Sequence, residues 1–154
     1  MRGGLIMAVI AAPALAQEPV APAVDPALVE ACLADTPAGD LAPPCIGAAA
    51  RQCQQAPGGD TTPGIAACVT GEHAAWDAAL NRAYQAARVH YGTDQTAADS
   101  LRDAQRAWIA WRDAECAFQY DRYGGGSLRS IAAANCRMSM TAMRALELRA
   151  MPGW

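Results

Sequence analysis

Apolar side chains recur every three or four positions over most of the second half of the chain, which is the spacing of one helix face. Thr62 can cap a helix and Pro63 suits its first turn, so one long helix is predicted from Thr62 to about Tyr91. Gly71 lies inside this helix and costs about 1 kcal/mol without ending it. The apolar stripe, which should face the core, comprises Ile65, Val69, Trp76, Leu80, Tyr84 and Ala87.

Two more helices follow the same pattern. Asp94 or Thr96 caps a helix that runs to about Tyr123, and a last helix is predicted from Leu128 to about Ala150. The apolar stripe of the first of these comprises Leu101, Ala104, Trp108, Ile109 or Trp111, Cys116 and Tyr120. Because short turns join consecutive helices, we expect antiparallel neighbours and a core of three helices.

The first half of the chain contains shorter helical segments. Asp25-Pro26 starts a helix to about Ala34, and Pro43-Pro44 opens a second one through Gln55. Residues 56–60 form a turn cluster. No stretch alternates like a strand, and Val and Ile are scarce. The predicted fold is therefore all-α: a small antiparallel helical bundle stapled by disulfides, with a helical N-terminal extension.

The first residues have the pattern of a secretory signal peptide. Arg2 precedes a short apolar run that ends in the small residues Ala14 and Ala16, which predicts cleavage after Ala16. The alternative is an uncleaved anchor, but the run is shorter than the roughly 20 residues that span a bilayer, so no stable membrane insertion is expected. The predicted organisation is a signal peptide (1–16), a disordered N-terminus (17–25), a helical disulfide-bound extension (26–60) and a helical domain (61–154). A periplasmic or secreted location follows.

Six cysteines in a small exported chain indicate three disulfides. Cys116 and Cys136 flank the turn between two neighbouring helices, so we expect them to pair. Closing a loop of that length stabilises a fold by about 3 kcal/mol in the chain-entropy model. Nearest-neighbour pairing gives Cys53–Cys68 and Cys32–Cys45 for the others, although many other pairings are open.

Composition disfavours several classes of ligand. The sequence has no Cys-x-x-Cys pair, and His73 and His90 lie at no ligand spacing from a cysteine, so neither a metal site nor a redox motif is expected. Every basic residue is arginine and the net charge is −3, which disfavours nucleic acid. Losing Arg2 with the signal peptide would take that charge from −3 to −4. We expect no cofactor, and a mildly acidic surface suits a basic protein partner.

Each of the first two long helices carries polar residues beside aromatic ones on one face. The members are Asp77, Asn81 and Tyr84 on the first helix, and Gln105, Trp108, Arg112 and Cys116 on the second. Folding the hairpin about residues 93–94 places Asn81 near Gln105 or Arg106, and it places Asp77 within a turn of Arg112. Such a set is most often a buried network that fixes helix register, and the alternative is a ligand or partner site.

These residues belong to a longer ordered pattern. It reads Asp-x-x-Leu-Asn-x-x-Tyr, then Leu-x-x-Ala-Gln-Arg-x-Trp-x-x-x-Arg-Asp-x-x-Cys, then Gly-Gly-Ser, Cys and Thr-x-x-Arg, and it covers about residues 68–150. Over this region the sequence resembles the lysozyme-inhibitor LprI-like family of exported bacterial proteins. Asp113 and Arg144 match its motifs, whereas residues 17–60 lie outside it. The resemblance implies a helical domain in the periplasm or cell envelope, and lysozyme inhibition as an activity that not every member need share.

We therefore expect a cell-envelope binding protein that blocks a glycan hydrolase sterically, with lysozyme or another such enzyme as the protein partner. The alternative is a periplasmic structural or adaptor module that binds another envelope protein without inhibiting lysozyme. The candidate contact is a protruding tip, the loop from Tyr123 to Ser127 with Gly124, Gly125 and Gly126, and the nearby acids are Asp113, Glu115 and Asp121. A lysozyme cleft accepts an extended glycan, so a narrow glycine-rich tip fits it.

An enzymatic role is not expected. Asp113 and Glu115 lie two positions apart on a helix, so they point to different faces and make a poor general acid/base pair. Ser127 follows three glycines, but the Gly-x-Ser-x-Gly pattern of a nucleophile elbow is absent, and no histidine is placed to activate it.

Overall fold

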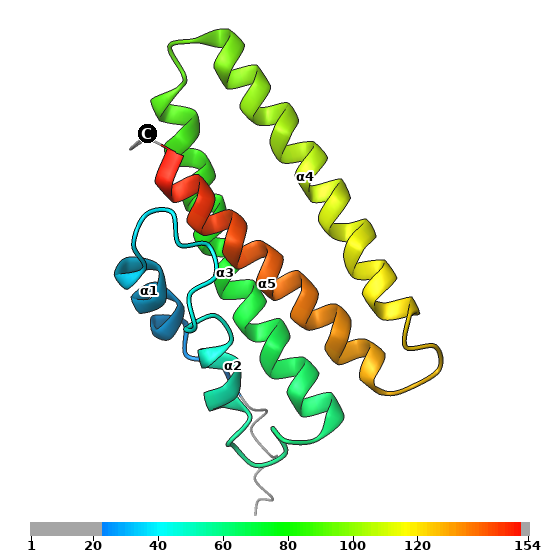
Figure 1. Ribbon diagram of the computed structural model, residues 1–154. Helices are drawn as coiled ribbons and strands as arrows, with labels where there is room; N and C mark the ends of the chain where they lie inside the picture. The colour runs from blue at the N-terminus through cyan, green and yellow to red at the C-terminus, as the bar shows by residue number, and fades with distance from the viewer. Residues whose placement is uncertain (1–22, 152–154) are drawn as a thin grey trace, which may run out of the picture.

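The computed structural model describes residues 23–151, and every regular element among them is helical (Figure 1). The helices are α1 (Pro26–Asp35), α2 (Ala48–Cys53), α3 (Thr62–His90), α4 (Gln95–Asp121) and α5 (Leu128–Ala150). The prediction of an all-α, disulfide-stapled bundle is confirmed. The predicted signal peptide lies outside the described residues, as do residues 17–22 of the predicted disordered N-terminus.

The starts of the long helices follow from their caps. The cap of α3 is Thr61, one residue before the predicted Thr62: its hydroxyl accepts a hydrogen bond from the Gly64 backbone N–H at 3.1 Å, and Pro63 lies in the first turn. Of the two caps that the sequence offered for α4, Asp94 is the one used, because its carboxylate accepts from the Thr96 backbone N–H at 2.9 Å. Both helices therefore begin where a side-chain acceptor precedes the apolar stripe.

Helix α5 is the centre of the three-helix domain. Figure 1 shows α5 running in the direction of α3 and opposite to α4, and both α3 and α4 pack against it. The expectation that α3 and α4 would be close neighbours is wrong, since they make little contact with each other. The reason lies in α4: Ala104 and Ile109 of its predicted stripe are exposed, and its buried residues are Gln105 and Cys116.

The core lies between α3 and α5. Trp76 of α3 is fully buried, and Ala142 and Ala145 of α5 are small enough to let the two helices approach closely. The buried core of these two helices includes Val69, Trp76, Ala79, Leu80, Ala134, Met138, Ala142, Ala145 and Leu148. The predicted stripe of α3 thus faces the core as expected.

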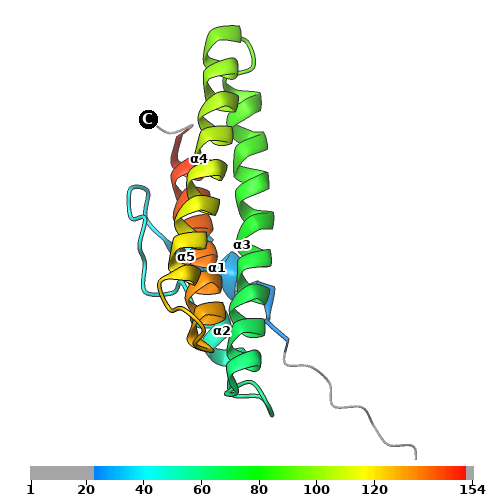
Figure 2. The ribbon, with the colours of Figure 1, turned by 90° about the vertical axis from the view of Figure 1, so that its right-hand side faces the viewer.

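The N-terminal extension, α1 and α2, packs on α3 on the side away from α4 (Figures 1 and 2). Its second helix is shorter than predicted: residues 44–47 form a turn, and the helix begins only at Ala48. Gly47 explains this start, because its φ of +86° is a left-handed conformation that interrupts a helix. The guanidinium group of Arg149 on α5 donates to the backbone carbonyls of Leu33 and Thr36, which ties the end of α1 to the bundle.

Gly71 has a packing role inside α3. A side chain there would bring its Cβ to 2.9 Å from Cγ2 of Val24, so the missing Cβ lets the chain before α1 lie against α3. Val24 is correspondingly half-buried. Among residues 23–151, none of the helices combines the length and the apolar character that crossing a membrane requires.

Candidate functional site

The end of the α4–α5 hairpin is held together by a disulfide. Cys116 of α4 and Cys136 of α5 are bonded, with their Cα atoms 5.5 Å apart. The structure also joins Cys53 to Cys68 and Cys32 to Cys45, so its three bonds match the pairs that nearest-neighbour reasoning favoured. The Cys116–Cys136 bond closes the base of the loop between α4 and α5. Cys53–Cys68 joins α2 to α3, and Cys32–Cys45 lies within the extension.

The loop itself is the tip predicted for partner contact. Residues 121–128 are all exposed, and the loop lies at one end of the bundle (Figure 1). Gly124 has a φ of +54°, which favours glycine, and the Gly126 backbone N–H donates to the Tyr123 carbonyl at 3.1 Å. Arg129 supports the loop from α5, since its guanidinium donates to the Gly124 carbonyl and lies 4.8 Å from the Tyr120 ring centroid. The tip is therefore a compact, exposed turn with a supported base.

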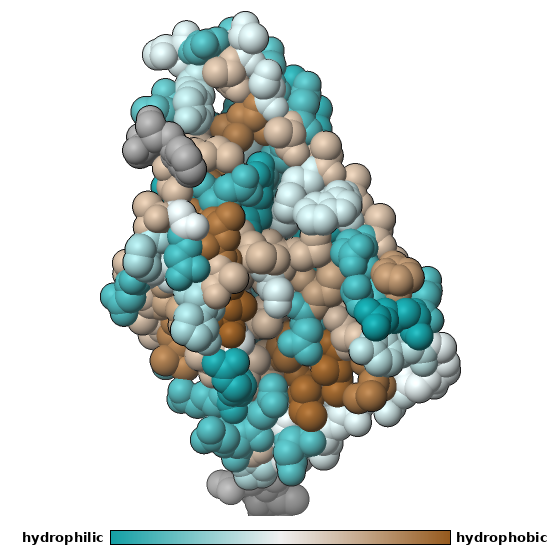
Figure 3. Space-filling view, in the orientation of Figure 1, coloured by the Kyte–Doolittle hydropathy of each residue, from teal (hydrophilic) through white to brown (hydrophobic). Residues whose placement is uncertain are grey.

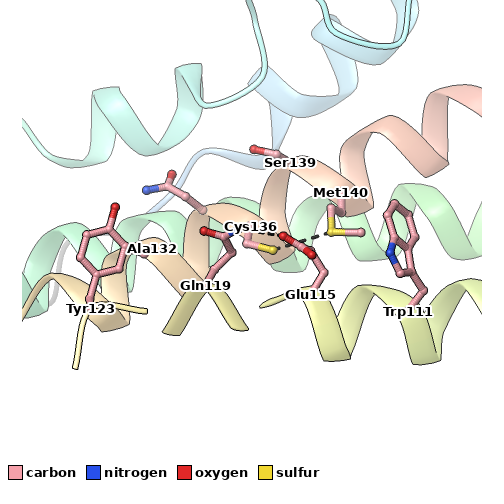
Figure 4. A pocket seen from close by; sticks show the side chains of 9 residues that line it. Trp111, Glu115, Gln119, Tyr123, Ala132, Cys136, Ser139 and Met140 are labelled. Carbon is pink, nitrogen blue, oxygen red and sulfur yellow. Dashed lines mark hydrogen bonds between the residues drawn. The ribbon is translucent and has the colours of Figure 1, made fainter. Parts of the chain in front are cut away.

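A groove runs from this tip along the α4–α5 seam (Figure 4). It has a volume of about 580 Å³ and is open to solvent. Its lining residues are Trp111, Glu115 and Gln119 of α4, Tyr123 of the loop, and Ala132, Asn135, Cys136, Ser139 and Met140 of α5. Figure 3 shows apolar surface over the lower part of α5, bordered by hydrophilic surface at the lower end of α4. Trp111 is 59% exposed, so a large aromatic side chain meets solvent here.

A smaller hollow continues the groove toward the other end of the seam. It shares Trp111 and Met140 with the groove and adds Leu41, Trp108, Met143, Arg144 and Glu147. Leu41 comes from the loop after α1 and is 39% exposed. The extension therefore contributes an apolar wall to a surface that otherwise belongs to α4 and α5.

A polar cluster lies beneath this hollow. The buried Arg144 donates through Nε to Gln105 Oε1 at 2.9 Å and through Nη1 to Glu147 Oε2 at 2.7 Å. Its Cζ atom is 5.9 Å from the centroid of the Trp108 ring, and the Cζ atom of Arg112 is 5.1 Å from it. Gln105, Trp108, Arg112 and Arg144, singled out from the sequence, are thus brought together, and the cluster joins α4 to α5.

The residues predicted on α3 lie elsewhere. Asp77 accepts from Asn81 Nδ2 at 3.1 Å on its own helix, and Tyr84 packs at the edge of the core. No hydrogen bond or ion pair links Asp77 to Arg112 within residues 23–151, and Arg112 instead pairs with Asp113 at 2.9 Å. The sequence placed Asp77 and Arg112 in one network, and their energetic coupling stays a prediction.

The pKa of His73 on α3 is affected by charged side chains of α3, α4 and α5. Burial lowers the pKa of His73, the carboxylates of Asp77 and Asp113 oppose that shift, and the cations of Arg112 and Arg137 add to it. The Nε2 atom of His73 is buried and has no hydrogen-bond partner among the described residues. The neutral imidazole is therefore the form that this position favours.

Glu72 was not singled out from the sequence. Its carboxylate is buried and accepts three hydrogen bonds: from the backbone N–H groups of Gly47 and Ala50, each at 2.7 Å, and from Trp76 Nε1 at 3.0 Å. It thereby caps α2 from α3 and docks the extension. The available signal was its spacing, since Glu72 falls at i+3 from Val69 and at i−4 from Trp76, on the core face.

The described residues include an exposed tip and an open groove. No group of three or more His, Cys, Asp or Glu side chains within residues 23–151 could hold a metal ion. Asp113 is exposed and paired with Arg112, whereas Glu115 lies in the groove beside Gln119. Trp is among the residue types enriched at binding hot spots, and Trp111 is exposed in the groove.

The region that contains the tip and the groove is similar to known proteins. The family model described as "Lysozyme inhibitor LprI" matches residues 53–148. An uncharacterized protein of Rhizobium meliloti (strain 1021), R02472, is 30% identical over 93 residues, which cover 53% of this chain and 67% of that protein. No solved structure gives a significant match. The matched residues include α3, α4, the tip, the groove and α5 as far as Leu148, and on this basis the chain belongs to the lysozyme inhibitor LprI family.

Proposed function

We propose that this protein is exported to the periplasm or beyond and blocks a lysozyme-type glycan hydrolase by occupying its cleft. The observation that carries the proposal is the family match over residues 53–148, a region that contains an exposed tip clamped by a disulfide. The proposed action is steric, with no bond made or broken by the inhibitor.

The tip has the chemistry that such a cleft accepts. Its glycines and Ser127 are small and carry no negative charge, so they avoid repulsion from the carboxylates with which these hydrolases work. Asp121 and Glu115 stand behind the tip, where they would meet a basic rim. Because the Cys116–Cys136 bond already orders the base of the loop, less conformational entropy is lost on binding.

The test is inhibition of a purified lysozyme by the oxidised protein, followed as clearing of a cell-wall suspension. Gly125→Trp is the informative variant, because no heavy atom lies within 4 Å of a Cβ built there and its φ is not positive. We expect a loss of inhibition of at least about tenfold with an unchanged melting temperature. Ala86→Trp, at an exposed position on α3, is the matched control.

Two outcomes would contradict the proposal in different ways. Undiminished inhibition by Gly125→Trp would remove the tip from the mechanism. Absence of inhibition by the parent protein, against lysozymes of several types, would favour an envelope adaptor that binds another protein.

A further inference from the structure

Arg144 shows which side chains this protein uses to hold a guanidinium group. The amide of Gln105 and the carboxylate of Glu147 accept its hydrogen bonds at 2.9 and 2.7 Å, and the indole of Trp108 lies 5.9 Å from its Cζ atom. One amide, one carboxylate and one indole ring thus surround one arginine. Each is a known source of attraction for a guanidinium, through charge-assisted hydrogen bonds or through the ring face.

The groove presents the same three kinds of group from α4 alone. Trp111, Glu115 and Gln119 follow one another at intervals of four residues, and Figure 4 shows them side by side along the groove. Gln119 Nε2 donates to Glu115 Oε1 at 2.7 Å, which holds the carboxylate in place, and Gln119 Oε1 accepts from Arg122 Nη1 at 3.1 Å. The other oxygen, Oε2, accepts no hydrogen bond from residues 23–151, so it is open to a further donor.

Trp111 differs from three other aromatic residues of this hairpin, Trp108, Tyr120 and Tyr123. The rings of Trp108, Tyr120 and Tyr123 each have the Cζ atom of an arginine of this chain at 5.1, 4.8 and 5.4 Å. No arginine of the described part of the chain lies over Trp111, although this ring is 59% exposed. The groove lining includes the carboxylate of Glu115 and no cationic side chain.

We propose that Trp111 and Glu115, whose carboxylate is held in place by Gln119, bind an arginine side chain presented by the partner protein. The inference rests on the proposed function, which supplies a protein partner of basic character, and it assigns that partner's arginine to the groove beside the tip. Charge complementarity with Glu115 and the flat face of Trp111 select a guanidinium over an ammonium group, because only the former is planar and forks to two acceptors.

The test is the affinity of the oxidised protein for an oligo-arginine peptide and an oligo-lysine peptide of equal length, measured by isothermal titration calorimetry. We expect the arginine peptide to bind about fivefold more tightly. Trp111→Ala and Glu115→Gln should each weaken its binding by about fivefold to tenfold, whereas Trp111→Phe should retain most of it. Phe118→Ala and Asp60→Asn, which replace an exposed aromatic and an exposed acid outside the groove, are the matched controls.

Equal affinity for the two peptides, or equal losses in Phe118→Ala and Asp60→Asn, would overturn the inference and leave only general acidic attraction. Binding of an N-acetylglucosamine oligomer that is lost in Trp111→Ala, without a preference for arginine, would assign the groove to sugar and also overturn it. A parent that binds arginine through the groove but leaves lysozyme active would refute the proposed function alone. If the Trp111→Ala variant inhibits lysozyme as strongly as the parent protein does, the inference is refuted and the proposed function stands.

Discussion

The two sides of α5 are built on different principles. The side of α5 that faces α3 carries alanine, leucine and methionine. These side chains pack against the fully buried Trp76 and other apolar residues of α3. Against α4, α5 meets a helix whose buried residues are Gln105 and Cys116. The first seam is an apolar core. The second is held by one disulfide, by the hydrogen bond from Arg144 to Gln105, and by the partly buried Leu101 and Trp108 that pack against the core.

This difference explains where a binding face can form. A helix that buries a broad apolar stripe has few large side chains left for solvent, whereas α4 keeps Ile109, Trp111 and Phe118 exposed. The covalent bond allows α4 to do this without leaving the bundle, because it restrains the helix independently of apolar contact. The candidate site accordingly lies on the α4 side of α5.

The largest effect is expected on the α3 side. Trp76→Ala removes a side chain with no exposed surface from the apolar seam and should lower the free energy of unfolding by about 3–5 kcal/mol. It also takes away the indole N–H that donates to Glu72. Urea melts check this, with Trp111→Ala as the control, which should cost less than about 0.5 kcal/mol. Similar losses in both variants would refute the contrast between the two helices.

Removing the disulfide should act mainly on the α4 side. Replacing both Cys116 and Cys136 by serine frees a loop with a sequence separation of 20 and should cost about 3 kcal/mol. Hydrogen exchange should quicken in α4 while α3 and α5 keep most of their protection. If the protection of α3 falls as much as that of α4, the two seams form one cooperative unit.

The polar part of the α4 seam should contribute less than the disulfide. Arg144→Met keeps the apolar stem but removes the donor to Gln105, whose side chain is buried, so we expect a cost of about 1–3 kcal/mol. A double-mutant cycle with Gln105→Leu isolates the pair. Additive costs would mean that the hydrogen bond at 2.9 Å contributes no coupling between α4 and α5.

The sequence predicted the α3 side of the molecule better than the α4 side. The stripe of α3 has a single period and Thr62-Pro63 marked its start to within one residue of the cap, Thr61, so the helix and its buried face followed directly. The stripe of α4 was ambiguous between Ile109 and Trp111, and both are exposed. When the buried residues of a helix are polar or disulfide-bonded, local periodicity does not predict which other helix it packs against.

The candidate site was predicted in part for the same reason. Gln105, Trp108 and Arg144 were recognised because they stand in an ordered motif, but their partner Glu147 and the groove residue Gln119 carry no such mark. Glu72 was missed because a carboxylate at a core position gains its meaning only from the backbone N–H groups of α2, which are distant in sequence. Tertiary hydrogen bonds of this kind are set by the fold and leave little trace in a local pattern.

The smallest effect should be a pH dependence of the stability that arises from His73 on α3. The pKa of His73 is lowered by burial, so the folded state binds fewer protons than the unfolded state once pH falls below the unfolded value of about 6.5. Stability from this group is therefore present near pH 7 and is lost as pH falls through the lowered folded pKa. His73→Gln should flatten the melting temperature over this window, whereas His90→Gln, at an exposed position on α3, should not. Because Asp77 raises the pKa of His73 and Arg112 lowers it, Asp77→Asn should move the NMR titration of His73 down and Arg112→Gln should move it up. If neither substitution shifts the titration of His73, the charges of Asp77 and Arg112 do not affect its pKa. Contacts of each helix with α5 would then be the only coupling between α3 and α4.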